Sequence, residues 1–312
     1  MPANLGGSVR RPKRTNIRVT SRDLDIMLSL AENQFLLTSQ IRALHFPSIH
    51  RTRKRLTLLY QNKYIDRMKI PSGIEDLPSE SVYYIKQSGL QLLLLHGKLH
   101  EAVSIPKTGR RPGNLMFLSH TLMRNSFRVA LQKSVQADSC VSLQDWRHDN
   151  SITRYVLLPD SKEQRLKRLP LKADAYFRLK LGNSEIEYFL EVDNGTMALS
   201  RLVDKMNGYY RWHLSSRQTP AGSLIRRRVL ILAFSNTRAK NIADKLLSLA
   251  KTNMVNTLWL VASVERNELI QKNLLTDPVW SQPTQSGLRQ VTFEQEMSEF
   301  VTRQNEVGKL YL

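Results

Sequence analysis

The stretch SIHRTRKRLTLLYQN, residues 48–62, decides how the N-terminal half of the chain is interpreted. Its first half carries basic residues and no acid, namely Arg51, Arg53, Lys54 and Arg55. Its apolar residues gather on one side and toward the C-terminal end, at Ile49, Leu56, Leu59 and Tyr60. The pattern predicts a helix that is anchored in a core along one face and exposes a basic N-terminal half. A recognition helix contacts the major groove of DNA through that half.

Two shorter helices are predicted before this stretch. Thr20 or Ser21 is placed to cap the first helix, in which apolar residues recur at helical spacing from Leu24 to Ala31. Thr38 is placed to cap the second helix, TSQIRALHF, and Pro47 ends it.

A hairpin and a fourth helix are predicted after the basic stretch. Strand-like runs cover Tyr64–Ile70 and Ser81–Lys86, and the intervening PSGIEDLPSE contains Pro and Gly turn signals. An apolar helix is expected over Gly89–Leu99. The order helix, helix, basic helix and hairpin is typical of a winged helix-turn-helix, which we place at residues 18–100.

Double-stranded DNA is the partner that these residues predict. Phosphate or base contacts are expected from the basic side chains of the helices and the hairpin, Arg42, Arg51, Arg53, Lys54, Arg55, Lys63, Arg67 and Lys69. The alternative interpretation of the Arg51–Arg55 run is a solvated helix face that binds nothing.

The composition of the whole chain agrees with a polyanionic partner. The 312 residues include 47 Lys and Arg against 27 Asp and Glu, which gives a net charge of +20. No membrane partner is expected, because no apolar run approaches the ~20 residues of a membrane span. Cys140 is the only cysteine, so intrachain disulfides and thiolate-rich zinc sites are excluded. A reducing, cytoplasmic location is expected.

The chain is expected to divide near residue 112. Residues 1–17 form a basic arm that we expect to be disordered, and residues 101–114, with two prolines and two glycines, form a linker. A second domain is placed at residues 115–265, and residues 266–312 are a C-terminal extension. The oligomeric state stays open, with a homodimer as one option.

The second domain alternates helices and strands. Helices are predicted over Leu115–Lys133, over Met197–His213, and over Thr237–Ala250 with Asn236 as its cap; strands are predicted over Ile152–Leu158, Leu171–Lys180, Ile186–Val192, Arg228–Phe234 and, as the last one, Thr257–Ala262. Hairpins and crossovers are both present, so the fold class is α/β (α+β) with a mixed sheet flanked by helices.

Three acids lie at neighbouring strand positions of this domain. Asp174 lies in LKADAYFRL, and Glu191 and Asp193 lie in YFLEVDNGT. Strand interiors disfavour acids, and these carboxylates would repel one another unless a cation lies between them. Mg²⁺ or Mn²⁺ bound by Asp174 and Glu191 would relieve the repulsion and could activate a water. A simple turn at Asp193-Asn194-Gly195 explains two of these residues but not Glu191.

Several segments resemble the replication-relaxation family of plasmids and mobile elements. The resemblance runs over roughly residues 18–280, and its carriers are RDLDIMLSLAENQFLLTSQI, SHTLMRNSF, KADAYFRL and FLEVDNGT. It implies a winged helix joined to a core similar to the PD-(D/E)xK nucleases, with a role in plasmid replication, relaxation or transfer.

The chain departs from the active nuclease pattern at one position. Asp174 and Glu191 match the two acids of the motif, but Asp193 stands where active enzymes have lysine. Lys205, on the following helix, is a candidate substitute, so Asp174, Glu191, Asp193 and Lys205 are the candidate catalytic residues. A surface lysine without a role is the alternative for Lys205.

Three functions remain open on these grounds. The first is a DNA-binding accessory protein of a plasmid or mobile element, working with other replication, transfer or recombination proteins. The second is an active Mg²⁺-dependent endonuclease or nickase. The third is a transcriptional regulator whose C-terminal half senses a ligand or dimerises. Tyr209 and Tyr210 are interpreted as core or groove residues, because no histidine pair of a relaxase accompanies them.

Overall fold

The computed structural model describes residues 16–70, 79–99, 114–148, 152–159, 166–195, 197–215, 226–253, 258–284 and 286–309. The predicted basic arm, up to residue 15, and the predicted linker, up to residue 113, lie outside these ranges. Contacts divide the chain into two compact units, Met1–Val129 and Ala130–Leu312. The boundary falls within helix α5 (Leu115–Gln136).

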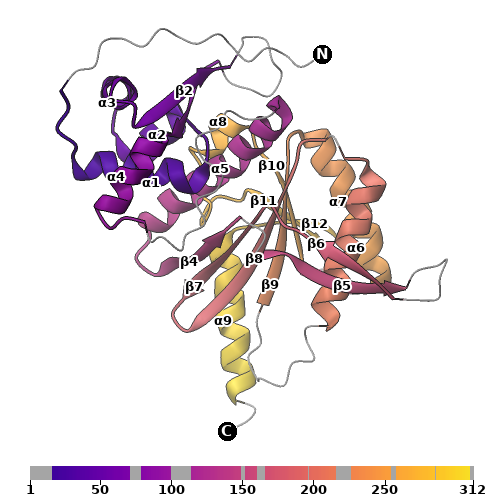
Figure 1. Cartoon of the computed structure of the whole chain (residues 1–312). Coiled ribbons are helices and arrows are strands. Elements are labelled where there is room, and N and C mark those ends of the chain that lie inside the picture. Colours follow the sequence, from indigo (N-terminus) through magenta and orange to yellow (C-terminus); the bar gives the residue numbers. More distant parts are fainter. Residues whose placement is uncertain are drawn as a thin grey trace. The chain divides into compact units, whose positions relative to one another are not determined.

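The first unit contains the helices and the hairpin that the sequence predicts. Its elements before α5 are α1 (Ser21–Asn33), β1 (Leu36–Leu37), α2 (Thr38–His45), α3 (Ile49–Gln61), β2 (Ile65–Lys69), β3 (Ser81–Ile85) and α4 (Gln87–Leu95), as Figure 1 shows. The short strand β1 was not expected from the sequence. It pairs with β3, so the sheet has three strands in the order β1-β3-β2.

Both faces of this small sheet are covered. Tyr83 and Ile85 of β3 face a core that α1, α3 and α4 complete. Val82 and Tyr84 face the opposite way, where Leu118 and Leu122 of α5 pack against them. Strand side chains alternate between faces, so β3 alone supplies apolar residues to both cores. The first turns of α5 are therefore an integral part of this unit.

The helix starts follow the predicted capping residues except at α2 and at α7 (Asn236–Asn253). The predicted cap Asn236 is the first residue of α7, and the Ser235 hydroxyl accepts the N–H of Arg238 at 3.2 Å. Thr20 caps α1 in a capping box, in which its side chain and the Asp23 side chain each accept a backbone N–H of the other. The prediction that Thr38 caps α2 is wrong by one residue. The cap is Leu37, whose N–H donates to Gln40 Oε1 at 2.9 Å, while the Thr38 hydroxyl donates to the carbonyl of Ser81.

The second unit is built around a large mixed sheet. After α5 come strands β4 (Val141–Arg147), β5 (Arg154–Pro159), β6 (Leu166–Leu171), β7 (Ala175–Leu181), β8 (Ser184–Asp193), β9 (Arg226–Ala233), β10 (Trp259–Ser263), β11 (Trp280–Thr284) and β12 (Gly287–Val291), with helices α6 (Leu199–Ser215), α7 (Asn236–Asn253), α8 (Arg266–Leu269) and α9 (Phe293–Lys309). The strand order is β12-β11-β10-β9-β8-β7-β4. Its central strands β8, β9 and β10 are parallel, and the outer pairs are antiparallel.

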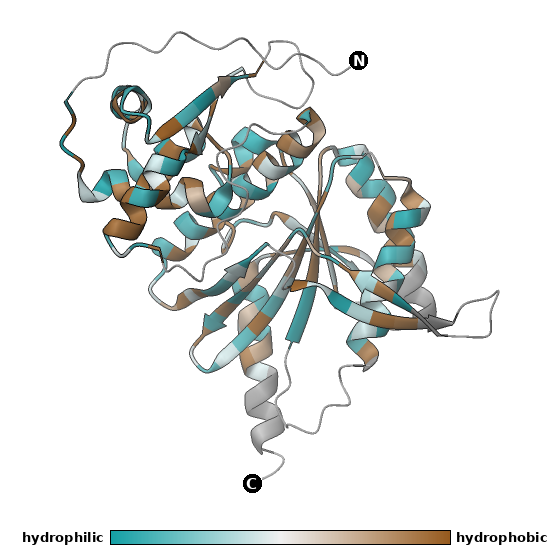
Figure 2. Ribbon diagram, in the orientation of Figure 1, coloured by the Kyte–Doolittle hydropathy of each residue, from teal (hydrophilic) through white to brown (hydrophobic). Residues whose placement is uncertain are grey.

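Helices α6 and α7 cover one face of this sheet, and α9 packs against the other (Figure 1). On the first face, Met206 and Tyr209 of α6 and Ile242 of α7 join one apolar core with the strands. Hydrophobic residues accordingly run along the central strands in Figure 2. On the second face, Phe293 of α9 packs against Tyr188 with ring centroids 4.9 Å apart.

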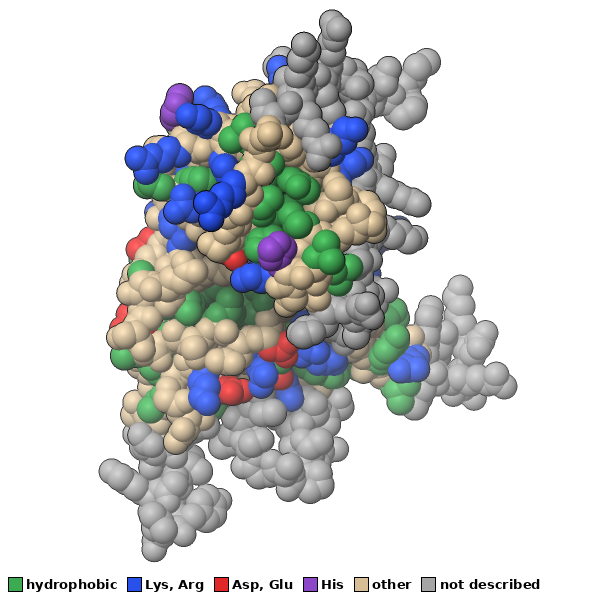
Figure 3. All heavy atoms as spheres, turned by 60° about the vertical axis from the view of Figure 1, so that its left-hand side comes forward, with side chains coloured by type: hydrophobic (Ala, Val, Ile, Leu, Met, Phe, Trp, Pro, Cys, Tyr) green, Lys and Arg blue, Asp and Glu red, His purple; other side chains and the backbone are tan. Residues whose placement is uncertain are grey.

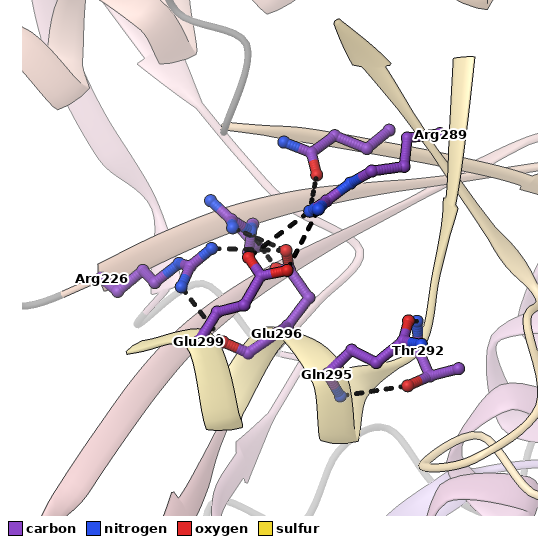
Figure 4. Close-up of polar contacts among 8 residues, drawn as sticks. Arg226, Arg289, Thr292, Gln295, Glu296 and Glu299 are labelled. Carbon is purple, nitrogen blue, oxygen red and sulfur yellow. Dashed lines mark hydrogen bonds and ion pairs between the residues drawn. The ribbon is translucent and has the colours of Figure 1, made fainter. Parts of the chain in front are cut away.

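Arginines fix α9 at its start (Figure 4). Glu296 is fully buried, and Arg228 of β9 donates two hydrogen bonds to its carboxylate. Arg226 adds a contact to the same side chain, and Arg289 of β12 pairs with Glu299 one turn further along α9. A buried carboxylate needs such donors to offset its lost hydration, so these bonds fix the position of α9 on the sheet.

The structure corrects several predicted strands. The segment Leu171–Lys180 was expected to be one strand, but it belongs to two. Leu171 ends β6, and residues 172–174 lead from the β5–β6 hairpin to β7 in the large sheet. The strand at Thr257–Ala262 is present as β10 but is not the last. Residues 266–312 supply β11, β12 and α9, so they complete the sheet rather than extend from it. Strand β4 was not predicted. Within the described ranges, no helix is long and apolar enough to cross a membrane.

Candidate functional sites: a basic helix and a carboxylate cluster

Helix α3 is anchored along one side and exposes three basic side chains. Ser48 caps it, with its hydroxyl accepting the Arg51 N–H at 3.5 Å. Leu56, Leu59 and Tyr60 are buried in the core of the first unit. Arg51, Arg53 and Lys54 are exposed, and in the described ranges none of the three pairs with an acid. We call Arg51, Arg53 and Lys54 the basic ridge. Figure 3 shows Lys and Arg side chains gathered on the side of the molecule that bears α3.

Arg55 differs from the basic ridge, although it belongs to the same run. Its guanidinium donates two hydrogen bonds to Asp23, whose side chain is fully buried, and a third to the carbonyl of Arg18 at 2.8 Å. Burial would raise the pKa of Asp23, but Arg55 and Thr20 outweigh it and leave that pKa below its ordinary value. Arg55 thus ties α3 to the start of α1.

The other predicted DNA contacts surround α3 in sequence. Lys63 and Lys69 are exposed, and Lys63 holds a positive φ of 64° in the turn that leads to β2. Arg67 stacks its guanidinium over the Tyr60 ring, 4.7 Å from the centroid. Arg42 is half-buried in the last turn of α2.

In the second unit, Asp174 lies in the turn directly before β7. Its backbone N–H donates to the carbonyl of Leu190 at 2.9 Å, and its Oδ2 accepts the N–H of Val192 at 2.8 Å. These two bonds join Asp174 to the residues on either side of Glu191, near the end of β8. The structure thereby brings together the two acids that the sequence pairs.

Glu191 is 4% exposed and uses both carboxylate oxygens. Lys205 Nζ donates to Oε2 at 2.5 Å, and the Tyr209 hydroxyl donates to Oε1 at 2.6 Å. Both donors come from α6, where they lie four residues apart on one face. Asp174, Glu191, Lys205 and Tyr209 form the carboxylate cluster.

Burial is the largest single influence on the pKa values of Glu191 and Lys205. It raises the pKa of Glu191 to about 7, against the lowering influence of Lys205 and with a further rise from Asp174. Burial lowers the pKa of Lys205, but Glu191 and Asp174 outweigh it and leave that pKa raised. Lys205 therefore stays charged and is the cation beside Glu191 and Asp174.

Asp193 belongs to a separate ion pair. Arg238 of α7 donates to its Oδ2 at 2.7 Å, and the N–H of Gly195 donates to its Oδ1 at 2.8 Å. Glu191 and Asp193 share one face of β8, but each has its own cation from a different helix.

The cluster fits a divalent metal poorly as it stands. Both oxygens of Glu191 already accept protein donors, and one oxygen of Asp174 accepts a backbone N–H. Among the described residues, no group of three or more His, Cys, Asp and Glu side chains is arranged to hold a metal ion. A metal would have to displace Lys205 from Glu191.

Two residues of these sites were missed at the level of sequence. Tyr209 is fully buried, consistent with a core residue, yet it also orients Glu191. The sequence signal for this role of Tyr209 was its position four residues after Lys205, which places both side chains on one face of the helix. Arg238 carries no sequence signal, because only the fold brings α7 to the end of β8.

The segment SHTLMRNSF in α5 has a structural explanation. Asn125 Nδ2 donates to the carbonyls of Asn33 and Phe35, at 3.0 and 2.6 Å, where α1 passes into β1. Ser126 accepts a bond from the buried Gln40 side chain at 2.9 Å. These bonds lie within the first unit and satisfy backbone groups that would otherwise be buried without partners.

Comparisons with known proteins give one result. Searches of curated proteins and of solved structures found no match. The family model described as replication-relaxation matches residues 27–227, which is more than half of the 312-residue chain. The matched range takes in α3, the α5 segment and the carboxylate cluster. The chain belongs to the replication-relaxation family.

Proposed function

We propose that this protein binds double-stranded DNA through the basic ridge of α3. Its family membership suggests a role in the replication or relaxation of a plasmid or mobile element. The observation that carries the proposal is the state of Arg51, Arg53 and Lys54, which are exposed on a capped helix whose opposite side is buried. Phosphates and base edges are the ligands that such side chains bind most strongly in a major groove.

The first unit acts as a winged helix in this proposal. Helices α2 and α3 would be the helix-turn-helix, with the N-terminal half of α3 in the groove. The β2–β3 hairpin would be the wing, and Lys63, Arg67 and Lys69 would reach the flanking phosphates. Residues 71–78, which join the two strands, lie outside the described ranges.

The test is the affinity for a labelled duplex, measured by fluorescence anisotropy. The triple variant Arg51→Ala, Arg53→Ala, Lys54→Ala should lose at least ~100-fold in affinity, since it removes phosphate contacts and base contacts together. The matched control is Lys240→Ala, Lys245→Ala, Lys272→Ala, which removes the same charge from exposed positions of the second unit.

The control separates specific contacts from net charge. We expect the control triple to bind the duplex within about threefold of the wild type, because it removes no positioned contact. Equal losses in both triples would mean that α3 contributes only charge, and the assignment of α3 would fail.

A second candidate is a metal-dependent endonuclease with a core like that of the PD-(D/E)xK nucleases. The observation in its favour is that Asp174, Glu191 and Lys205 meet, with lysine supplied by α6 instead of by position 193. Against it, Lys205 and Tyr209 occupy both oxygens of Glu191. The geometry therefore favours a hydrogen-bonded structural cluster of Glu191, Lys205 and Tyr209 over a Mg²⁺ or Mn²⁺ site.

A further inference from the structure

The β5–β6 hairpin is a two-stranded sheet, separate from the larger sheets of both units. Its inner side packs against α6, through Val156 and Leu171, which are buried, and Leu169. The approach is close enough that a Cβ on Gly208 of α6 would lie 2.7 Å from a methyl of Leu171. The hairpin is therefore fixed on one side only.

The outer side of the hairpin exposes apolar and aromatic surface. Tyr155 pairs with Pro170 across the strands, and Leu157 pairs with Arg168, so these four side chains share one face. Tyr155 is 48% exposed and Leu157 is 58% exposed. The guanidinium of Arg168 lies over the Tyr155 ring, 3.7 Å from its centroid. An exposed ring with an arginine stacked on it presents flat surfaces to a ligand.

This hairpin is basic as a whole. Residues 152–172 include six Lys and Arg against two Asp and Glu, and Arg168 lies on the outer face. The hairpin leads directly to the carboxylate cluster, because the carbonyl of Lys172 accepts a hydrogen bond from Lys205 at 2.9 Å. Tyr155 and Arg168 on the outer face suit an anionic ligand that offers flat apolar groups.

We propose that the outer face of the β5–β6 hairpin, formed by Tyr155, Leu157, Arg168 and Pro170, binds single-stranded DNA. Unpaired bases stack on aromatic rings and on guanidinium planes, and phosphates pair with the surrounding basic side chains. In a duplex, the base faces are stacked on one another and are not available to Tyr155. The site is distinct from the duplex contact proposed for α3, and neither depends on the other.

The test compares a labelled single strand of mixed sequence with a duplex of equal length, both titrated with the full chain in anisotropy measurements. We expect Tyr155→Ala with Arg168→Ala to weaken single-strand binding by about tenfold or more, because each lost base stack has a cost of that size. Duplex affinity should stay within about twofold, since α3 is intact. Tyr155→Phe should keep single-strand affinity, because the ring remains.

Two controls make the outcomes decisive. Lys245→Ala removes one exposed charge from α7 and should leave single-strand binding nearly unchanged. The triple variant of the basic ridge should show the converse pattern, with duplex binding lost and single-strand binding retained. The proposal is overturned if the wild type does not bind the single strand, if Lys245→Ala has the same effect as the hairpin variant, or if the hairpin variant loses duplex binding equally.

Discussion

Neighbouring arginines of one helix have different tasks in this protein. Arg53 and Arg55 lie two residues apart in α3, yet Arg53 is exposed and Arg55 is bonded to Asp23 and to a backbone carbonyl. The direction of each side chain around the helix decides which one meets the buried carboxylate. A substitution of Arg55 should therefore change the stability of the first unit, and a substitution of Arg53 should change DNA binding.

Arg55→Ala should destabilise the first unit, and Arg53→Ala should not. Removing Arg55 leaves the fully buried Asp23 without its cation, at a cost on the order of 2 kcal/mol, less than for a fully buried pair because Arg55 itself is partly exposed. Urea denaturation of the two variants gives the comparison. If both variants unfold at the wild-type midpoint, the ion pair has no part in stability.

Glu191 should make stability depend on pH. Its pKa is raised from 4.5 to about 7 in the folded protein, mainly by burial, so the folded state binds more protons than the unfolded chain between these values. Stability contributed by the protonated carboxyl is present below about pH 4.5 and is lost as the pH rises through about 7.

Position 191 cannot titrate in the variant Glu191→Gln, which should flatten this decline by on the order of 3 kcal/mol across the window. The free energy of unfolding, measured at several pH values, tests this. Glu294→Gln at an exposed position of α9 is the control and should follow the wild-type curve. A Glu191→Gln curve parallel to the wild type would show that Glu191 does not titrate in this range.

At the scale of elements, α5 belongs to the core of the first unit over residues 115–129. Asn125→Ala should cost about 2–3 kcal/mol, because it leaves the carbonyls of Asn33 and Phe35 buried without a donor. Denaturation followed by hydrogen exchange should place the loss at the α1–β1 junction. Gln136→Ala, at the exposed end of α5, is the control, and an equal effect of both would contradict the role of Asn125.

The elements also show what the sequence could predict. Helix α3, its Ser48 cap and the β2–β3 hairpin follow from periodicity and local signals, which act within a few residues. Strand β11 was missed because its sequence, WSQPT, is mostly polar and holds a proline, and β12 was missed because it exposes most of its side chains.

The candidate site was predictable in its acids and in Lys205, but not in Tyr209 and Arg238. Asp174 and Glu191 stand out because strands disfavour carboxylates. Tyr209 and Arg238 reach the end of β8 from helices that lie further along the chain, and only the sheet order brings them there. Arg55 was expected at the DNA, because composition does not reveal an ion pair across 32 residues of sequence.

At the scale of the whole molecule, the carboxylate cluster should not make this protein a nuclease. Lys205 already neutralises Glu191, so millimolar Mg²⁺ or Mn²⁺ should not raise the melting temperature by mass action on the folded state. Supercoiled plasmid should remain uncut over the same range. A metal-dependent rise in melting temperature that Glu191→Ala abolishes, together with nicking, would establish the enzyme instead.

The salt dependence of duplex binding tests the central claim most directly. The logarithm of the binding constant falls linearly with the logarithm of the salt concentration, with a slope near −0.9 for each phosphate contact. We predict that the slope of the triple variant Arg51→Ala, Arg53→Ala, Lys54→Ala is smaller than that of the wild type by roughly 2–3, and that Lys240→Ala, Lys245→Ala, Lys272→Ala keeps the wild-type slope. Identical slopes and affinities for the wild type and the α3 variant would contradict the account, because the basic ridge would then not touch DNA.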